Sequence, residues 1–191
     1  MTRAALEAVV IGCSAGGLTA LQTLLGGLRR PLPVSVTIVC HSGSESMAMF
    51  CELLQRHSPM PVGEAEERLT PEPGNVYVAP SGYHLLLERD GQYALSVDGR
   101  VEYSRPSIDV LFESAADLWQ DRLLGLVMTG ANADGAQGLE YLRNRGGLAV
   151  VEDPATATVS TMPAAALERA GADYCLPLPE IAPLLEILCS R

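Results

Sequence analysis

The sequence lacks several features that would assign it to a well-known class at once. None of its 191 residues is a lysine, and 13 basic residues face 23 acidic ones, which gives a net charge of −10. Such an acidic chain is a poor partner for nucleic acid or for an anionic membrane surface. It has no apolar run of membrane-spanning length and no signal-peptide core at its start. These absences predict a cytoplasmic protein without nucleic-acid partners and without membrane insertion.

Cysteine is present, but not in a pattern that builds disulfides or a zinc site. The cysteines are odd in number, with no C-x-x-C pair (Cys13, Cys40, Cys51, Cys175, Cys189). This usage is typical of reduced, mostly buried thiols in the cytosol. We expect no cofactor and no metal. A hydrophobic content of 48% over 191 residues predicts one packed domain over residues 1–191.

The stretch around Ser14 combines an apolar strand, a glycine-rich turn and an amphipathic helix. The spacing Gly12-x-Ser14-x-Gly16 is that of a nucleophile elbow, in which small neighbours let the backbone bend and expose the serine hydroxyl. The amides that open the helix then face any anion formed there. The glycines do not fit G-x-G-x-x-G, and no P-loop lysine follows. A plain strand–helix turn, with Ser14 as a helix cap, is the alternative.

Strand-like and helix-like segments alternate along the rest of the chain. Strands are expected over residues 9–13, 34–40, 62–65, 75–79, 123–128, 148–152 and 172–176. Helices are expected over 18–28, about 44–57, 105–119, 135–144, 163–170 and 180–188. A β-hairpin with an Asp-Gly turn is predicted over 83–97. This order predicts an α/β fold: a doubly wound, mostly parallel sheet with helices on both faces and an antiparallel β-hairpin insertion.

Three chemically reactive residues follow predicted strands, at the edge where ligands bind in such sheets. Ser14 follows the first strand, His41 the second, and Asp134 the strand over 123–128. A serine hydroxyl needs an adjacent base, and a carboxylate holds that base in the right tautomer. We therefore expect a triad of Ser14, His41 and Asp134, with His57 and His84 as surface or packing residues.

Each member of this candidate triad has a structural alternative. His41 could be a loop histidine at a strand end, and residues 134–137 fit a capping box, in which Asp134 would accept amides of its own helix. Asp153, in a turn before a proline, and Asp109, inside a helix, are rival acids. The cysteines that precede the serine and the histidine are rival nucleophiles, but both end strands and are expected to be buried. With the histidine they would form an incomplete metal site.

Taken together, five motifs resemble the catalytic domain of the chemotaxis protein-glutamate methylesterases, the CheB family. They extend from about residue 9 to 185: residues 11–17 around Ser14, His41 at its strand end, 76–80 with His84, 105–112, and 129–136. The order Ser, His, Asp separates the chain from α/β-hydrolases, which have Ser, Asp, His.

The resemblance implies hydrolysis of glutamyl methyl esters on the cytoplasmic helices of chemoreceptors, with release of methanol, and often deamidation of receptor glutamines. It implies Ser14 as nucleophile, His41 as general base and then acid, and Asp134 as the residue that orients His41. The backbone amides of Ala15 and Ala131 would bind the oxyanion. A separate regulator or signalling partner is also implied. The net charge of −10 predicts repulsion of a glutamate-rich helix, which salt would screen.

The chain departs from the family pattern at several positions. Cys40 stands where the family usually has glutamine, and Ser42-Gly43 where it has Met-Pro. In the loop over 130–135, Ala131 replaces a methionine, which keeps the amide but opens the pocket wall. Only residues 1–8 precede the first strand, so we expect a standalone form without the usual receiver domain. A related serine esterase, or an inactive module that binds a receptor or partner, is the alternative function.

Overall fold

A seven-stranded parallel sheet forms the centre of the computed structural model, which describes residues 4–41 and 46–190. Its strands lie in the order β3-β4-β2-β1-β7-β8-β9. Their bounds are β1 Ala8–Cys13, β2 Ser35–Cys40, β3 Val62–Glu64, β4 Val76–Val78, β7 Leu123–Val127, β8 Leu148–Glu152 and β9 Tyr174–Leu176. Every neighbouring pair is parallel, so the predicted sheet is confirmed.

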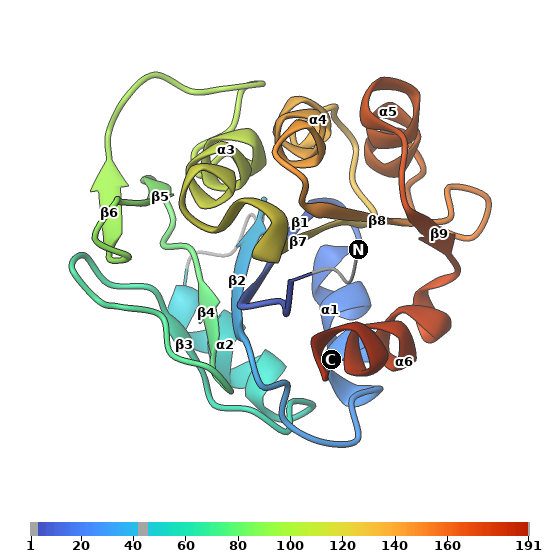
Figure 1. The fold of residues 1–191 in the computed structure, drawn as a ribbon, viewed down its shortest axis with the longest axis horizontal. Helices are drawn as coiled ribbons and strands as arrows, with labels where there is room; N and C mark the ends of the chain where they lie inside the picture. The colour runs from blue at the N-terminus through green and yellow to red at the C-terminus, as the bar shows by residue number, and fades with distance from the viewer. Residues whose placement is uncertain (1–3, 42–45, 191) are drawn as a thin grey trace.

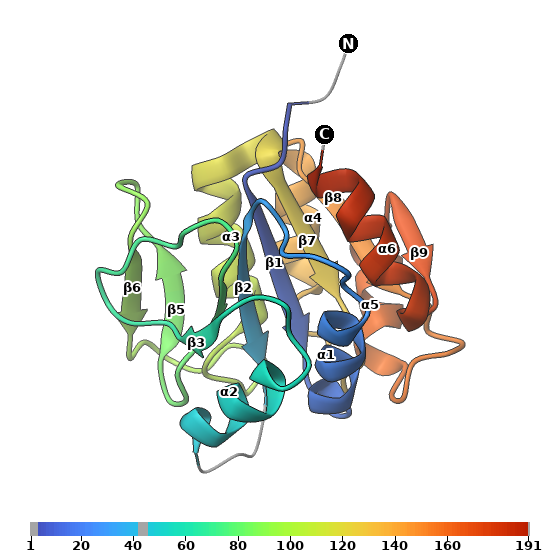
Figure 2. The same ribbon diagram turned by 90° about the horizontal axis from the view of Figure 1, so that it is seen from below.

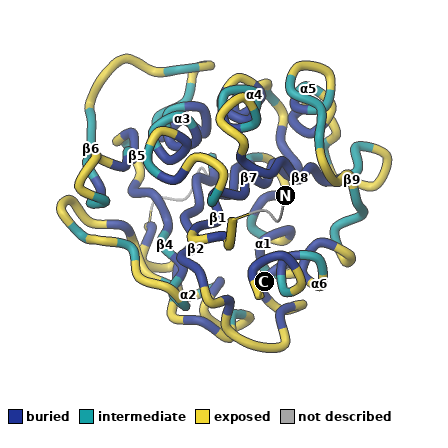
Figure 3. Tube along the Cα trace, viewed as in Figure 1, coloured by how far each residue is buried: buried dark blue, intermediate teal, exposed yellow. Residues whose placement is uncertain are grey.

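Helices cover both faces of this sheet (Figure 1). On one face lie α1 Gly17–Gly26, α2 Met47–Gln55 and α6 Leu178–Cys189; on the other lie α3 Ile108–Trp119, α4 Ala136–Asn144 and α5 Thr161–Ala170. A short 3-10 helix, η1 Gln120–Arg122, links α3 to β7. Side chains of a strand alternate between faces. In β1, Val9 and Ile11 therefore enter one core cluster, while Ala8 and Val10 enter the other. The central strands are buried throughout (Figure 3).

The predicted hairpin is also confirmed, as β5 His84–Leu87 and β6 Tyr93–Ser96. It forms its own two-stranded antiparallel sheet beside α3, rather than an extension of the parallel sheet. Leu85 and Tyr93 are buried against the α3 side of the core, and the Leu87 N–H donates to Ser114 Oγ at 3.1 Å. The hairpin therefore packs against the side of α3 that faces away from α4 (Figure 1).

Helix boundaries differ from the expectation by a few residues. Helix α2 begins at Met47, where the Ser46 Oγ accepts the Met49 N–H at 3.3 Å. The expected start near residue 44, and the departure at Ser42-Gly43, lie outside the described residues. Helix α5 begins at Thr161 and α6 at Leu178, each two residues earlier than expected. No helix among the described residues has the length and apolar character needed to cross a bilayer.

The sheet order has one reversal point, between β1 and β7. From β1 the chain extends outward through β2, β4 and β3, and from β7 through β8 and β9. Strands β1 and β2 end at the same edge of the sheet, where the residues after them lie (Figure 2). In open α/β sheets the crevice for a ligand forms at the carboxyl ends of the strands beside such a point.

Candidate active site

Ser14 and His41 leave adjacent strands at the same level. β1 and β2 pair in register up to Cys13 and Cys40, and the His41 N–H donates to the Cys13 carbonyl at 3.0 Å. Paired strands lie about 5 Å apart, so the backbones of Ser14 and His41 are neighbours at the carboxyl edge. Ser14 is half-buried at the reversal point between β1 and β7.

The turn after Ser14 uses its two glycines for different reasons. Gly16 has a φ of +78°, a left-handed conformation that opens α1 and that a residue with a Cβ rarely adopts. Gly12 instead lies under α3, where a Cβ would come 2.3 Å from Ile108 Cγ2. Only Gly16 therefore serves the bend that the elbow pattern suggested. Gly12 allows α3 to approach β1.

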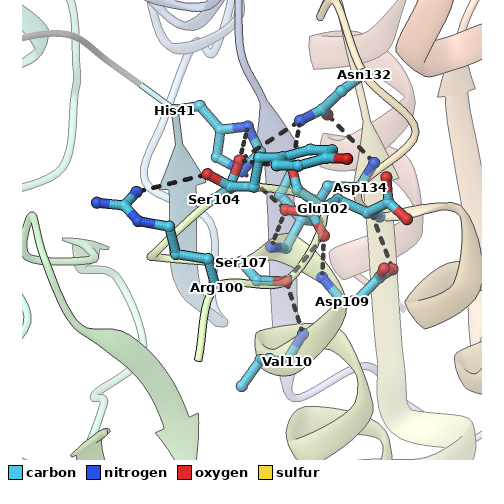
Figure 4. A network of polar contacts seen from close by, with 12 residues as sticks. His41, Arg100, Glu102, Ser104, Ser107, Asp109, Val110, Asn132 and Asp134 are labelled. Atoms are coloured by element: carbon cyan, nitrogen blue, oxygen red, sulfur yellow. Dashed lines mark hydrogen bonds and ion pairs between the residues drawn. The ribbon is translucent and has the colours of Figure 1, made fainter. Parts of the chain in front are cut away.

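Asp134 and His41 form a hydrogen-bonded pair (Figure 4). His41 Nε2 lies 2.8 Å from Asp134 Oδ2, and the Asp134 side chain is fully buried. Asp134 also accepts the Ser107 hydroxyl at 2.9 Å, the Ile108 N–H at 2.7 Å and the Asp109 N–H at 3.0 Å. An ionised carboxylate only accepts, so His41 Nε2 carries the proton and Nδ1 keeps a free lone pair. That nitrogen can act as a base.

The surroundings of Asp134 keep it ionised. Burial alone would raise its pKa, but the hydrogen bonds from His41, Asp109 and Ile108 outweigh burial and hold the pKa below its ordinary value. Two of these donors are the first amides of α3, whose helix dipole also favours a negative charge. The site therefore contains a fixed negative charge that orients the imidazole.

The capping-box alternative for Asp134 is not what the structure contains. Helix α4 opens at Gly135, at φ +98°, with no side-chain cap. Asp134 instead accepts amides of α3, while Asp109 of α3 accepts the N–H groups of Gly135 and Gly138 at 2.9 and 2.6 Å. The carboxylate that precedes α4 thus accepts amides at the start of α3, and the carboxylate in α3 accepts amides at the start of α4. These reciprocal hydrogen bonds fix α3 against α4. Burial and the charge of Asp134 raise the pKa of Asp109 to about 7.

Ser104, which the sequence did not single out, faces the other side of the His41 ring. Its hydroxyl lies 3.3 Å from His41 Nδ1. The Ser14 hydroxyl makes no hydrogen bond to His41 among residues 4–41 and 46–190. The structure thus joins two members of the expected triad and leaves the third beside them. Ser104 ends a tight turn in which Glu102 and Tyr103 have φ values of +48° and +64°.

Asn132, from the loop after β7, supports this turn. Its amide group donates to the Glu102 carbonyl at 3.3 Å and to Ser104 Oγ at 3.4 Å. The Asn132 side-chain oxygen in turn accepts the Asp134 N–H at 3.2 Å. Asn132 therefore connects the two groups that contact His41.

His84 is buried and fully hydrogen-bonded, as a packing histidine would be. Its Nδ1 accepts the Ser107 N–H at 3.1 Å, so its Nε2 carries the proton and donates to the Gly99 carbonyl at 2.9 Å. Ser107 also donates to Asp134, so His84 helps to position the residue that precedes α3. The sequence grouped His84 with residues 76–80 in the family pattern and gave no signal of this contact with Ser107. His57 is exposed near the end of α2.

Thr129 and Glu152 hold the turn that carries Ser14, and sequence reasoning missed both. The Thr129 carbonyl accepts the Ser14 N–H at 2.9 Å, and its hydroxyl donates to the Ala15 carbonyl at 2.9 Å. Glu152, buried at the end of β8, accepts the Thr129 N–H at 2.7 Å. Burial raises the pKa of Glu152. A carboxylate at the end of an apolar strand is the signal that could have found it.

The expected oxyanion donors are free to act. Within the described ranges, neither the Ala15 N–H nor the Ala131 N–H donates a hydrogen bond to another residue.

The rival acid Asp153 and the rival nucleophile Cys13 are occupied or buried. Asp153 accepts the Ala155 N–H in its own turn at 2.9 Å. A hydrogen bond with Cys40 and burial raise the pKa of Cys13 well above its ordinary value, which disfavours a reactive thiolate.

A doubly wound sheet with a serine at its reversal point and a histidine–aspartate pair beside it has the arrangement of a serine hydrolase. Comparison with known proteins places the chain more closely. Residues 9–185 match the family model described as CheB methylesterase, and the chain belongs to this family.

Relatives and a solved structure agree with this assignment. The chain is 47% identical over 178 residues to a putative protein-glutamate methylesterase/protein-glutamine glutaminase of Leptospira interrogans, covering 93% of this chain and 92% of the relative. It is 41% identical to a protein-glutamate methylesterase/protein-glutamine glutaminase of Pseudomonas savastanoi, covering 93% of this chain but 53% of that protein. The crystal structure of the Thermotoga maritima CheB methylesterase catalytic domain matches with a TM-score of 0.91 and 30% identity, over 97% of this chain and 100% of that chain.

Proposed function

We propose that residues 1–191 form one catalytic domain that hydrolyses glutamyl methyl esters on chemoreceptors, releasing methanol, and that also deamidates glutamine side chains there. The proposal rests on one observation above all. A buried, ionised Asp134 fixes the His41 tautomer in which Nδ1 is unprotonated, and Ser14 follows the strand that pairs in register with the strand before His41.

In the proposed reaction, His41 Nδ1 takes the proton of the Ser14 hydroxyl as its oxygen attacks the ester carbonyl. The amides of Ala15 and Ala131 bind the oxyanion that forms. The protonated His41 then gives its proton to the methoxide oxygen, and methanol leaves. Water attacks the glutamyl–Ser14 ester in the same way and restores the enzyme. Asp134 stays ionised throughout and stabilises the imidazolium.

Methanol release from a methylated receptor fragment tests the proposal. The purified chain should release methanol, and Ser14→Ala should lower the rate by on the order of 10⁴-fold or more while the fold is retained. Cys13→Ala is the matched control, because its thiol precedes Ser14 in the chain but is buried. A wild-type chain that binds the fragment and releases no methanol would support the inactive binding module instead. Activity lost in Cys13→Ala and retained in Ser14→Ala would assign the nucleophile to the thiol.

A further inference from the structure

A cavity of about 200 Å³ adjoins His41 on the side of the Ser104 turn. Ser14 is not among its described lining residues. The polar groups of the wall belong to His41, Ser81, Arg100, Tyr103, Ser104 and Arg105, and no carboxylate of the described residues lines it. The cavity therefore offers hydrogen-bond donors and positive charge next to the proposed base.

Neither arginine of this wall forms an ion pair within the part of the chain that the structure describes. The described ion pairs engage other arginines, and neither Arg100 nor Arg105 takes part in one. Arg100 is exposed, and its one hydrogen bond to a described residue, the Tyr103 carbonyl, is 3.5 Å long. Arg105 donates through Nη1 to the carbonyls of Val97 and Asp98 at 2.8 and 3.0 Å, and its buried Nε has no partner among the described residues. Arg105 therefore anchors the loop, and Arg100 extends its guanidinium beside Ser104 (Figure 4).

Two arginines without an ion pair to any described residue are unexpected in a chain whose 13 basic residues are outnumbered by 23 acidic ones. A guanidinium presents a planar set of donors that matches a carboxylate in a bidentate pair. A glutamyl methyl ester is neutral, so the arginines cannot attract the reacting group itself. A free carboxylate close to the ester in the same substrate can be attracted.

We infer that this cavity is a subsite for a carboxylate side chain of the substrate protein, which binds mainly to Arg100. The inference rests on the proposed function and refines its substrate class: glutamyl esters that have an unmodified acidic residue nearby. It also changes the expected effect of salt on substrate binding. The whole chain repels an acidic helix, whereas the cavity beside His41 attracts one acidic side chain, so salt should weaken the selective part of binding.

Two peptides test the subsite. Both carry one glutamyl methyl ester, and the flanking positions hold glutamate in one and glutamine in the other. The wild-type chain should cleave the glutamate-flanked peptide with a kcat/KM about tenfold higher, mainly through KM, and added salt should reduce this ratio. Arg100→Gln should bring the ratio close to one, and Arg100→Lys should restore part of it. Arg89→Gln, in the hairpin turn outside the cavity, is the matched control and should keep the wild-type ratio.

Binding of the same peptides, measured by fluorescence anisotropy, reads the subsite without turnover. If the chain binds the glutamate-flanked peptide more tightly and cleaves neither, the proposed function fails and the subsite stands. If wild type cleaves or binds both peptides equally, or if Arg89→Gln loses the preference as Arg100→Gln does, the subsite is wrong. A fall in kcat for both peptides in Arg100→Gln, with KM unchanged, would also overturn it, since it would assign Arg100 to the transition state.

Discussion

The two sides of the His41 ring are built very differently. On the Nε2 side, a fully buried Asp134 accepts four hydrogen bonds of 3.0 Å or less, three of them from α3 and the residue before it. On the Nδ1 side, Ser104 makes one contact of 3.3 Å from a turn whose Tyr103 is 92% exposed. The orienting half of the site is therefore preorganised, and the half that must admit a substrate rests on an exposed loop.

The largest effect is expected on the buried side. Asp134→Asn replaces one acceptor oxygen by an NH₂ group, which would then face donors of Ser107, Ile108, Asp109 or His41. We expect kcat to fall on the order of 10⁴-fold, because the His41 tautomer is lost. The free energy of unfolding should also fall by about 1–3 kcal/mol for each donor left unsatisfied. Methanol release and urea denaturation measure the two effects.

Asp153→Asn is the control, because its oxygen can still accept the Ala155 N–H. It should keep both activity and stability. Equal losses in Asp134→Asn and Asp153→Asn would contradict the assignment of Asp134.

The support behind Asp134 gives a smaller effect. His84→Leu leaves the buried Ser107 N–H without its acceptor, which should cost about 1–3 kcal/mol of unfolding free energy. In His84→Asn the Oδ1 atom can replace Nδ1, and part of the loss should be recovered. The exposed His57→Leu should change stability by less than about 0.5 kcal/mol. If His84→Leu is as stable as the wild type, His84 does not position α3.

The reciprocal hydrogen bonds of Asp109 and Asp134 between α3 and α4 predict that the stability of the fold depends on pH. Folding raises the pKa of Asp109 to about 7, so the folded state binds the proton more tightly than the unfolded one. The stabilising contribution of this group is complete below about pH 4, the ordinary pKa of an aspartate, and is lost as the pH rises to about 7. Within that range the free energy of unfolding should fall by about 1.4 kcal/mol per pH unit.

Asp109→Asn tests this pH dependence. It keeps the one oxygen that accepts both Gly135 and Gly138, and it removes the titration. The melting temperature of Asp109→Asn relative to wild type should be higher at pH 8 than at pH 5. A difference that does not change with pH would contradict the raised pKa.

The smallest effect is expected on the exposed side. Ser104→Ala removes one long hydrogen bond to His41 Nδ1, which is worth about 0.5–1.5 kcal/mol, so kcat should change by less than about tenfold. Asn132→Ala, which releases the same turn, should have an effect of similar size. A loss in Ser104→Ala as large as that in Ser14→Ala would make Ser104, rather than Ser14, the hydroxyl that His41 activates.

The same contrast separates what the sequence could predict from what it could not. The apolar pattern of the sequence shows where each strand ends, so Ser14, His41 and Asp134 could be placed at one edge of a parallel sheet. The partner of Asp134 was harder to predict, since the capping-box pattern at 134–137 is local, whereas the amides that it accepts belong to α3, some 26 residues earlier in the chain.

The exposed side was not predicted at all. Ser104, Arg100 and Asn132 meet through irregular turns, which have no periodicity. The left-handed conformations of Glu102 and Tyr103 are of a kind that glycine or asparagine usually signals, and neither residue gives that signal. Sequence patterns therefore located the residues that follow strands and missed the irregular turn beside His41.

Covalent labelling with a sulfonyl or phosphonyl fluoride tests the central claim most directly, because the reagent bonds to the hydroxyl that the histidine activates and releases fluoride. Trypsin cuts this lysine-free chain only at arginine, so Ser14 and Ser104 fall in separate peptides, residues 4–29 and 101–122. The account predicts one label per chain, on Ser14, with a much slower reaction in Asp134→Asn and none in unfolded protein. A label on Ser104, or labelling at an unchanged rate in Asp134→Asn, would contradict it.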